Sequence, residues 1–261
     1  MEKTYGWIGS LLTIELPSGE VNKTQSMDYA GDFIGGRLLA SRIYWNEVSK
    51  DTGALEPENV LMIMPGPLAG TPATACSRWV ISAKSPHSYP DQYGFGNGGG
   101  FLGAALKLAG YDGLIIRGRA KAPSYILIEN EKVELRDASG LWGLTSEETM
   151  EKLRQHHGSS ARIVCIGPAG ENMVRFAIAN TDQGGALSNG MGAVMGSKNI
   201  KAIVVRGSKK VPVAYPEKLS EINKRMRFLR KGLHESVYMT EPMIEGIEKV
   251  KAAPCYGCPA G

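Results

Sequence analysis

The sequence predicts an α+β fold made of one structural unit that occurs twice, followed by a helical C-terminal segment. Short apolar runs of strand length alternate with glycine-rich turns and helical patterns through most of the chain. Four of these features recur in the same order, roughly 90 to 100 positions further along. A two-fold duplication explains this spacing better than a solenoid, because a solenoid repeats a shorter unit more often.

The composition is typical of a globular protein with a sizeable core. The chain has 261 residues, of which 43% are hydrophobic and 21% are charged. Its net charge of +4 is small and its basic residues are scattered, which argues against nucleic acid as a partner. No apolar run approaches the roughly 18 residues of a membrane span, and the N-terminus lacks the apolar part of a signal peptide. We therefore expect a cytoplasmic protein that binds neither membranes nor nucleic acid.

The first copy of the unit begins with a predicted hairpin over residues 7–21, which turns at Pro17–Glu20. Residues 28–48 then carry a helical pattern that is interrupted by Gly35 and Gly36. We expect these two glycines to allow close contact between the helix and a sheet. Buried strands are predicted at residues 60–64, 78–83 and 113–118.

A glycine-rich stretch, residues 94–103, separates two of these strands and leads into an Ala/Leu-rich helix. Glycine occupies six of its ten positions, which leaves backbone N–H groups uncovered beside a helix N-terminus. Such a site favours phosphate or pyrophosphate. The motif Gly-x-Gly-x-x-Gly is present, but no buried strand precedes it, so a Rossmann site is not predicted. A flexible surface loop is the alternative interpretation.

The second copy repeats this order of features. A hairpin is predicted over residues 125–135, and Thr145 and Glu148 form a capping box at the start of a helix that ends near His157. The matching segments of the two copies are 61–67 with 163–168, 78–81 with 174–178, the helix start after residue 99 with 190–193, and 114–118 with 203–207. The duplication therefore predicts a second glycine-rich run near residues 184–192 that faces the first. Two facing runs would suit a flat ligand with phosphates at both ends.

The composition changes after Val213, where we place a boundary between residues 1–212 and the start of a helical domain, residues 213–261. Helices are predicted at residues 216–233 and 240–251. Cys255 and Cys258 follow, and two thiolates at this spacing can bind one metal ion or part of an iron–sulfur cluster. A redox-active dithiol is the alternative, although that motif normally begins a helix after a strand.

The other reactive side chains are expected to have ordinary surroundings. Cys165 lies within a strand pattern and is predicted to be buried, and Cys76 is not expected to bind metal. Arg78, at the start of a strand, is interpreted from the residues alone as an exposed charge. The histidines are all expected to be exposed to solvent: His87, His156, His157 and His234.

Taken together, these motifs make the chain resemble the N-terminal portion of the tungsten-pterin aldehyde ferredoxin oxidoreductase family. The resemblance extends over nearly the whole chain. It rests on ordered matches at Trp7–Gly9, Ser18–Glu20, Gly35–Arg37, Pro57–Asn59, Gly66–Thr71, Gly99–Ala104, Leu108–Asp112, Ile166–Asn172, Gly192–Lys198 and Pro254–Cys258. It implies that the duplicated unit forms two β-sheets with short helices. These would form a base for a bis-pterin cofactor of tungsten or molybdenum, beside a [4Fe–4S] cluster.

The resemblance also implies roles for individual residues. Arg78 would donate hydrogen bonds to both the cluster and a pterin, a bridging task that suits a guanidinium. Asn97 and Gly185 would offer backbone carbonyls to a Mg²⁺ ion that joins the pterin phosphates. Cys255 and Cys258 would supply two of the four cluster ligands. The remaining contacts to the cofactor would come from Gly98, Gly99, Gly184 and Ala186.

An enzyme of this family would oxidise aldehydes to carboxylic acids and pass the electrons to ferredoxin, in an anaerobic setting and as a homo-oligomer. No catalytic residue is predicted within this chain. The family's spacing puts another cluster cysteine directly after Gly261, so we expect an incomplete, inactive part, or one completed by a second chain. Two alternatives stay open. One is part of a related aromatic acyl-CoA reductase, and the other is a scaffold without cofactor, because residues 184 and 187–189 lack the family's usual arginines.

Overall fold

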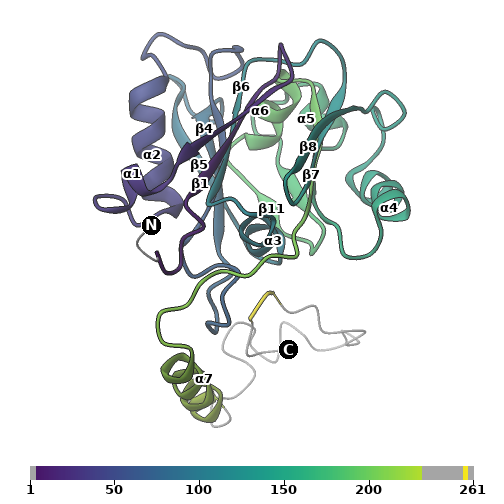
Figure 1. Cartoon of the computed structure of the whole chain (residues 1–261). Helices are drawn as coiled ribbons and strands as arrows, with labels where there is room; N and C mark the ends of the chain where they lie inside the picture. Colours follow the sequence, from purple (N-terminus) through teal and green to yellow (C-terminus); the bar gives the residue numbers. More distant parts are fainter. Residues whose placement is uncertain (1–3, 231–254, 258–261) are drawn as a thin grey trace, which may run out of the picture.

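The computed structural model describes residues 4–230 and 255–257 and shows an α+β fold with two six-stranded mixed sheets (Figure 1). The first sheet contains β1 (Ser10–Glu15), β2 (Glu20–Gln25), β3 (Leu61–Pro65), β4 (Trp79–Ser85), β5 (Gln92–Gly98) and β6 (Gly113–Arg117). The second sheet contains β7 (Ser124–Glu129), β8 (Lys132–Asp137), β9 (Arg162–Cys165), β10 (Ala179–Thr181), β11 (Ala186–Leu187) and β12 (Ile200–Arg206).

The topology of the sheets confirms the predicted duplication. The strand order is β2-β1-β6-β3-β4-β5 in the first sheet and, read in the same sense, β8-β7-β12-β9-β10-β11 in the second. Each strand of the first sheet thus has a counterpart six strands later. The parallel pair also recurs, because β1 runs parallel to β6 and β7 runs parallel to β12, whereas all other neighbours are antiparallel.

Four helices cover the faces of the two sheets (Figure 1). Helix α2 (Gly36–Glu47) packs on the outer face of the first sheet, and α4 (Ser146–His157) packs on the outer face of the second. Between the sheets lie α3 (Leu102–Ala109) and α6 (Met191–Ser197), in one apolar core that both copies share. Strands such as β3 are therefore buried on both faces, which explains their unbroken apolar sequence.

A buried lysine also connects the two copies. Lys198, directly after α6, is 0% exposed. Its Nζ donates to the carbonyl oxygens of Pro57 at 3.1 Å, Gly118 at 2.9 Å and Asn59, all of which precede the second copy. Burial of this ammonium group lowers the pKa of Lys198 to about 8. Lys198 therefore joins the end of α6 to backbone carbonyls that precede the second copy.

Three expectations about the elements need correction. The helix predicted over residues 28–48 is divided into α1 (Met27–Ala30) and α2, because Gly35 and Gly36 have φ values of 92° and 56°. A Cβ on Gly35 would lie 3.4 Å from Pro67, but one on Gly36 would contact nothing within 4 Å, so only Gly35 makes a close contact. Residues 174–178 do not form the expected strand; β10 begins at Ala179, after the short α5 (Pro168–Glu171).

The third correction concerns the glycine stretch. Its first half, up to Gly98, is an edge strand, β5, and not a loop, since it pairs with β4 from Trp79 to Ser85.

The capping box of α4 is confirmed: Thr145 N donates to Glu148 Oε2 at 2.8 Å and Glu148 N donates to Thr145 Oγ1 at 3.2 Å. One histidine was also misjudged, because His157 is buried and lies 3.1 Å from Tyr125 Oη, although His87 and His156 are exposed as expected.

Beyond the duplicated unit, helix α7 (Pro216–Arg230) agrees with the predicted start of the helical segment. It contacts the first copy through Asn223, which donates to Pro72 O at 2.8 Å and accepts from Thr74 N at 3.1 Å. The helix predicted at residues 240–251 and His234 lie outside the described residues. Among the described helices, none is both long enough and apolar enough to cross a bilayer.

Candidate cofactor site

The first glycine run, residues 94–103, is shaped by the buried indole of Trp79. Trp79 is 1% exposed and lies directly behind the run. A Cβ on Gly98 would fall 2.2 Å from its ring, and one on Gly103 would fall 2.9 Å from its Cβ, so both positions require glycine. The indole Nε1 also donates to Gly99 O at 2.8 Å. The run is therefore a supported surface at the start of α3.

The second glycine run, residues 184–192, lies against the first, as the duplication predicts. A Cβ on Gly96 would be 3.0 Å from Ser188 N, so β5 and β11 approach at backbone distance. Asn189 Nδ2 donates to Phe95 O at 2.6 Å, and Ser85 Oγ donates to Asn189 O at 2.7 Å. These contacts hold the two runs side by side.

The residues expected to bind Mg²⁺ and phosphate lie on these two runs. Asn97 is exposed on β5, and Ala186 is exposed at the start of β11. Gly184 has a φ of 73° and nothing within 4 Å of a Cβ position, so its backbone is uncovered. The carbonyl of Gly185 accepts a hydrogen bond from Thr181 N at 2.8 Å, which leaves its second lone pair for another partner.

Cys255 lies at the end of the first run, close to Arg78. A Cβ on Gly99 would be 3.2 Å from Cys255 Sγ and 4.0 Å from Arg78 Nη1, so both groups border the space that this glycine leaves open. The neighbours of Cys255 fix its place: Tyr256 N donates to Gly100 O at 3.2 Å, and Ala75 N donates to Gly257 O at 2.9 Å. Arg78 is exposed, as expected. Cys258 lies outside the described residues.

Cys76 and Cys165 are the other two cysteines among the described residues. Cys165 is fully buried, its Sγ lies 3.5 Å from Ser146 O, and burial raises the pKa of its thiol to about 12, which confirms it as a core residue. Cys76 is half-buried, and burial raises its pKa as well. Within residues 4–230 and 255–257, no group of three Asp, Glu, His or Cys side chains is placed to hold a metal ion.

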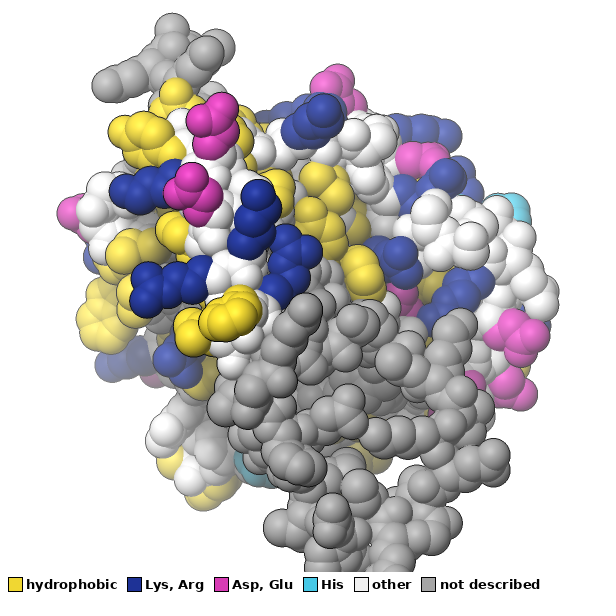
Figure 2. Space-filling view, turned by 90° about the horizontal axis from the view of Figure 1, so that it is seen from below, with side chains coloured by type: hydrophobic (Ala, Val, Ile, Leu, Met, Phe, Trp, Pro, Cys, Tyr) yellow, Lys and Arg dark blue, Asp and Glu magenta, His cyan; other side chains and the backbone are white. Residues whose placement is uncertain are grey.

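The face that carries α7 and Cys255 has mixed chemistry (Figure 2). Lysine and arginine side chains lie on both sides of the grey residues, with hydrophobic patches between them. Basic groups on this face would favour anions.

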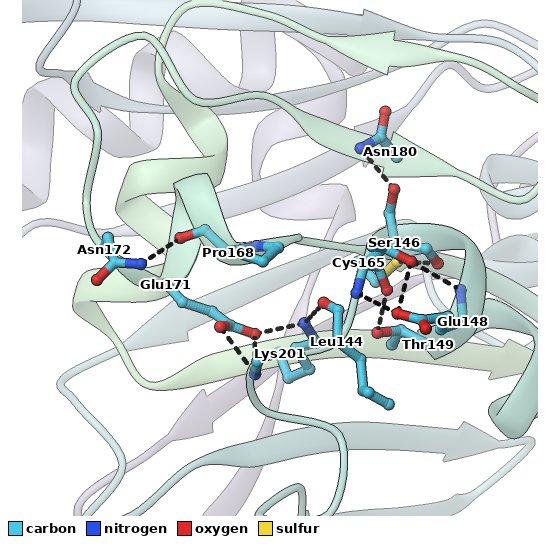
Figure 3. Close-up of polar contacts among 12 residues, drawn as sticks. Leu144, Ser146, Glu148, Thr149, Cys165, Pro168, Glu171, Asn172, Asn180 and Lys201 are labelled. Carbon is cyan, nitrogen blue, oxygen red and sulfur yellow. Dashed lines mark hydrogen bonds and ion pairs between the residues drawn. The ribbon is translucent and has the colours of Figure 1, made fainter.

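A cleft of about 560 Å³ opens beside the second run, between it and α4. Ser146 and Asn180 line its floor and are joined by a hydrogen bond from Asn180 Nδ2 to Ser146 Oγ of 3.2 Å (Figure 3). On its other side, Arg154 Nη2 donates to Asp182 O at 2.8 Å, which fixes α4 to the loop before Gly184. The capping box predicted α4, but nothing in the sequence indicated which loop the helix would face.

A buried ion pair lies next to the turn that precedes α4. Lys201 on β12 pairs with Glu171 and donates to Leu144 O at 2.8 Å, and Glu171 accepts from Gly143 N at 2.9 Å (Figure 3). Both side chains are almost fully buried, so each needs the other as a partner. The pair anchors the turn that precedes α4.

A group that the sequence did not indicate lies where the two runs meet. We call Arg162, Asp182 and Gln183 the junction. Arg162 Cζ lies 4.6 Å from the centre of the Phe101 ring, and its Nη1 lies 3.8 Å from Asp182 Oδ2. Two buried acceptor atoms of the junction, Asp182 Oδ1 and Gln183 Oε1, have no hydrogen-bond partner among the described residues. Burial raises the pKa of Asp182, whereas Arg162 and Arg154 act in the opposite direction.

The part of the chain that contains both glycine runs matches a known protein family. A family model described as the N-terminal domain of aldehyde ferredoxin oxidoreductase matches residues 11–207. The chain belongs to this family. The part of this chain that the family model matches extends from β1 to the end of β12. Helix α7 and Cys255 lie outside the matched residues.

Relatives that are named for different activities share this region. A tungsten-containing aldehyde ferredoxin oxidoreductase of Pyrococcus furiosus is 43% identical, over 82% of this chain and 36% of the relative. The WOR-like subunit of an aliphatic sulfonate oxidoreductase of the same organism is 37% identical, over 84% of this chain and 37% of the relative. A solved structure, the active site complex BamBC of benzoyl coenzyme A reductase with 1,5-dienoyl-CoA, aligns with a TM-score of 0.83 and 35% identity, over 90% of this chain and 37% of that one. The chain therefore spans little more than a third of the length of these relatives.

Proposed function

We propose that this chain forms the cofactor-binding base of a tungsten or molybdenum bis-pterin oxidoreductase, which oxidises aldehydes to carboxylic acids with ferredoxin as electron acceptor. The observation that carries the proposal is the contact between two glycine runs, one from each copy of a duplicated unit, with Arg78 and Cys255 at one end. Membership of the aldehyde ferredoxin oxidoreductase family supports it.

The residues present fit a pterin with phosphate groups. Gly99 and Gly184 leave backbone unshielded by side chains, and α3 begins within the first run, so N–H groups can bind phosphate oxygens. Gly99 leaves open a space beside Cys255 that a Cβ would fill. When bound, the metal–pterin group would supply the two-electron oxidation.

The residues of this chain would then hold and orient the cofactor. Arg78 would donate to a pterin and to the iron–sulfur cluster from its exposed position beside Gly99. Asn97 and the free lone pair of Gly185 O would bind the Mg²⁺ ion between the phosphates, because Mg²⁺ prefers oxygen ligands. Cys255 and Cys258 would supply two cluster ligands, and the other two would come from further along the chain or from a second chain.

The substrate is a separate question, because the relatives that share this region are named for different substrates. The proposal that the substrate is an aldehyde is supported by the family and by the relatives at 43% identity. Part of an aromatic acyl-CoA reductase is the second candidate, favoured by the TM-score of 0.83 with the benzoyl coenzyme A reductase complex. Both candidates use the same base and differ in the domains that would surround it.

The proposal is tested by metal and pterin analysis of protein purified without oxygen, from cells supplied with tungstate and molybdate. We expect tungsten or molybdenum and pterin bound to the chain, and iron in addition where the remaining cluster ligands are present. A well-folded sample with neither metal nor pterin would contradict the proposal and leave the scaffold interpretation.

A further inference from the structure

The second half of helix α7 is exposed and basic. Lys224, Arg225 and Arg227 are all exposed, and none of them forms an ion pair with another described residue. The acidic residues of the helix, Glu217 and Glu221, both precede this half. The helix therefore presents a local excess of positive charge, although the net charge of the whole chain is only +4.

Large apolar side chains are exposed between these charges. Ile222 is 47% exposed, Met226 41%, Phe228 74% and Leu229 59%. A groove of about 300 Å³ continues the surface towards the start of the helix and is lined largely by apolar side chains. Figure 2 shows basic and hydrophobic side chains mixed on the face that carries α7. Exposed apolar side chains surrounded by polar ones are typical of a surface that binds another protein.

The cysteine end of the candidate cofactor site lies next to this helix. Asn223 Oδ1, on α7, accepts hydrogen bonds from Thr74 N at 3.1 Å and from Thr74 Oγ1 at 2.9 Å. The next residue, Ala75, donates from its N to Gly257 O at 2.9 Å. Helix α7 and the segment that contains Cys255 are thus bonded to neighbouring residues of one loop. A protein that binds to α7 would therefore lie beside the Cys255 thiol.

The charge and the position of this surface indicate the kind of partner. Basic side chains attract an acidic protein, and the attraction speeds the encounter of partners that bind only transiently. Under the proposed function, electrons leave through the cluster that Cys255 and Cys258 would help to bind. Ferredoxins are small, acidic electron carriers. Such a carrier must approach the cluster closely, because the rate of electron transfer falls steeply with distance.

Resting on the proposed function, we propose that the second half of α7 is the surface on which ferredoxin docks. Lys224, Arg225 and Arg227 attract and orient the acidic carrier, and Phe228 and Leu229 pack against its apolar surface. The interface is small, as is usual for electron-transfer partners, so the complex should be weak and sensitive to salt.

The test measures the binding of an oxidised [4Fe–4S] ferredoxin to the 261-residue chain by isothermal titration calorimetry, at low and at high salt. One variant combines Lys224→Gln, Arg225→Gln and Arg227→Gln, because glutamine removes the charge and is a good helix former. The control combines Lys50→Gln, Lys121→Gln and Lys152→Gln, which removes the same charge from exposed positions outside α7. Circular dichroism checks that both variants remain folded.

We expect the α7 triple variant to bind ferredoxin about tenfold more weakly at low salt, because three exposed charge pairs are lost. The difference should shrink at high salt, which screens these charges. Phe228→Ala should weaken binding by a similar factor at both salt concentrations, because apolar contacts are not screened. The control triple variant should bind as the unaltered chain does.

The outcomes separate the docking surface from the proposed function. Equal dissociation constants for the two triple variants would overturn the inference, as would equally tight binding of α-lactalbumin, an acidic protein without a redox group. A chain that retains metal and pterin but does not bind ferredoxin would overturn the inference and leave the cofactor-binding role intact. A chain with neither metal nor pterin that also fails to bind ferredoxin would overturn both.

Discussion

Gly98 is the most tightly constrained residue of the first glycine run. A methyl group at this position would fall 2.2 Å from the Trp79 ring, and the indole cannot retreat because it is buried between β4 and α3. The requirement for glycine is therefore steric and concerns packing; its φ is not in the left-handed region.

Gly98→Ala should destabilise the chain by about 1–3 kcal/mol, the usual cost of overpacking a core. Gly140→Ala is the matched control, because nothing lies within 4 Å of its Cβ position, and its effect should stay within about 0.5 kcal/mol. Urea unfolding followed by tryptophan fluorescence measures both. Equal midpoints for the two variants would show that Trp79 moves aside without cost.

Arg78 offers a test of the cluster end of the site. Its guanidinium lies beside the space at Gly99 that Cys255 also borders, so its positive charge should stabilise the reduced cluster. Arg78→Gln should therefore lower the reduction potential of the cluster in cluster-containing protein, as measured by a redox titration followed by electron paramagnetic resonance. The exposed Lys121→Gln should leave it unchanged. A potential that Arg78→Gln does not alter would rule out the bridging role.

The lowered pKa of Lys198 should make the stability of the chain depend on pH. Its pKa is lowered from 10.5 to about 8 by burial, so the unfolded chain binds more protons than the folded chain between these values. The stability that depends on this group should thus rise with pH from about 8 to 10.5, by up to about 3 kcal/mol at about 1.4 kcal/mol per pKa unit. Unfolding free energies of the unaltered chain and Lys198→Met at pH 7.5, 9 and 10 should diverge accordingly. Parallel pH profiles would contradict the lowered pKa.

At the scale of elements, Asn223 supplies the hydrogen bonds by which α7 is attached to the first copy among the described residues. Asn223 is buried where the helix meets the first copy, and its amide bonds both to Pro72 O and to Thr74. The rest of the described part of α7 is largely exposed. Its placement beside Pro72 and Thr74 therefore follows from polar contacts more than from burial of apolar surface.

Asn223→Ala should lower stability by about 1–3 kcal/mol, because three hydrogen bonds are lost at the contact of α7 with the first copy. It should also speed proteolytic cleavage within α7 relative to the duplicated unit. Lys224→Ala, at the exposed next position of the same helix, should do neither. Unchanged cleavage of Asn223→Ala would mean that other contacts hold the helix.

The elements also show what the sequence could predict. Long apolar strands such as β3 and β12 were located correctly because both of their faces are buried. The short β10 and β11 were not, because Asn180 and Thr181 carry no apolar pattern and are held by pairing with β9. The two facing runs were predicted from the duplication, but the junction was not, since Asp182 and Gln183 resemble ordinary turn residues until Phe101 and Arg162 are placed beside them.

At the scale of the whole molecule, the two copies share one core. Residues of both sheets, of α3 and of α6 belong to the same buried cluster. Lys198 of the second copy also donates hydrogen bonds to the backbone carbonyls of Pro57 and Gly118, which precede that copy. Neither copy can bury its inner face alone. The boundary after residue 212 stays a prediction, since α7 contacts the first copy.

The copies expressed separately, as residues 1–121 and 122–212, should therefore remain largely unfolded, while residues 1–212 should unfold in a single transition. Circular dichroism and dye binding to exposed apolar surface would measure this, with the two fragments mixed as a control for association. A cooperative transition in either isolated copy would contradict the shared core.

The two glycine runs have matching positions in the topology but different surroundings. The first is backed by Trp79 and bordered by Cys255, whereas the second opens onto a cleft beside α4 and has the junction at its start. A ligand with two chemically identical halves would thus become inequivalent on binding, with one half beside the thiol and the other remote from it. The two copies thus keep one topology but give a bound ligand two different environments.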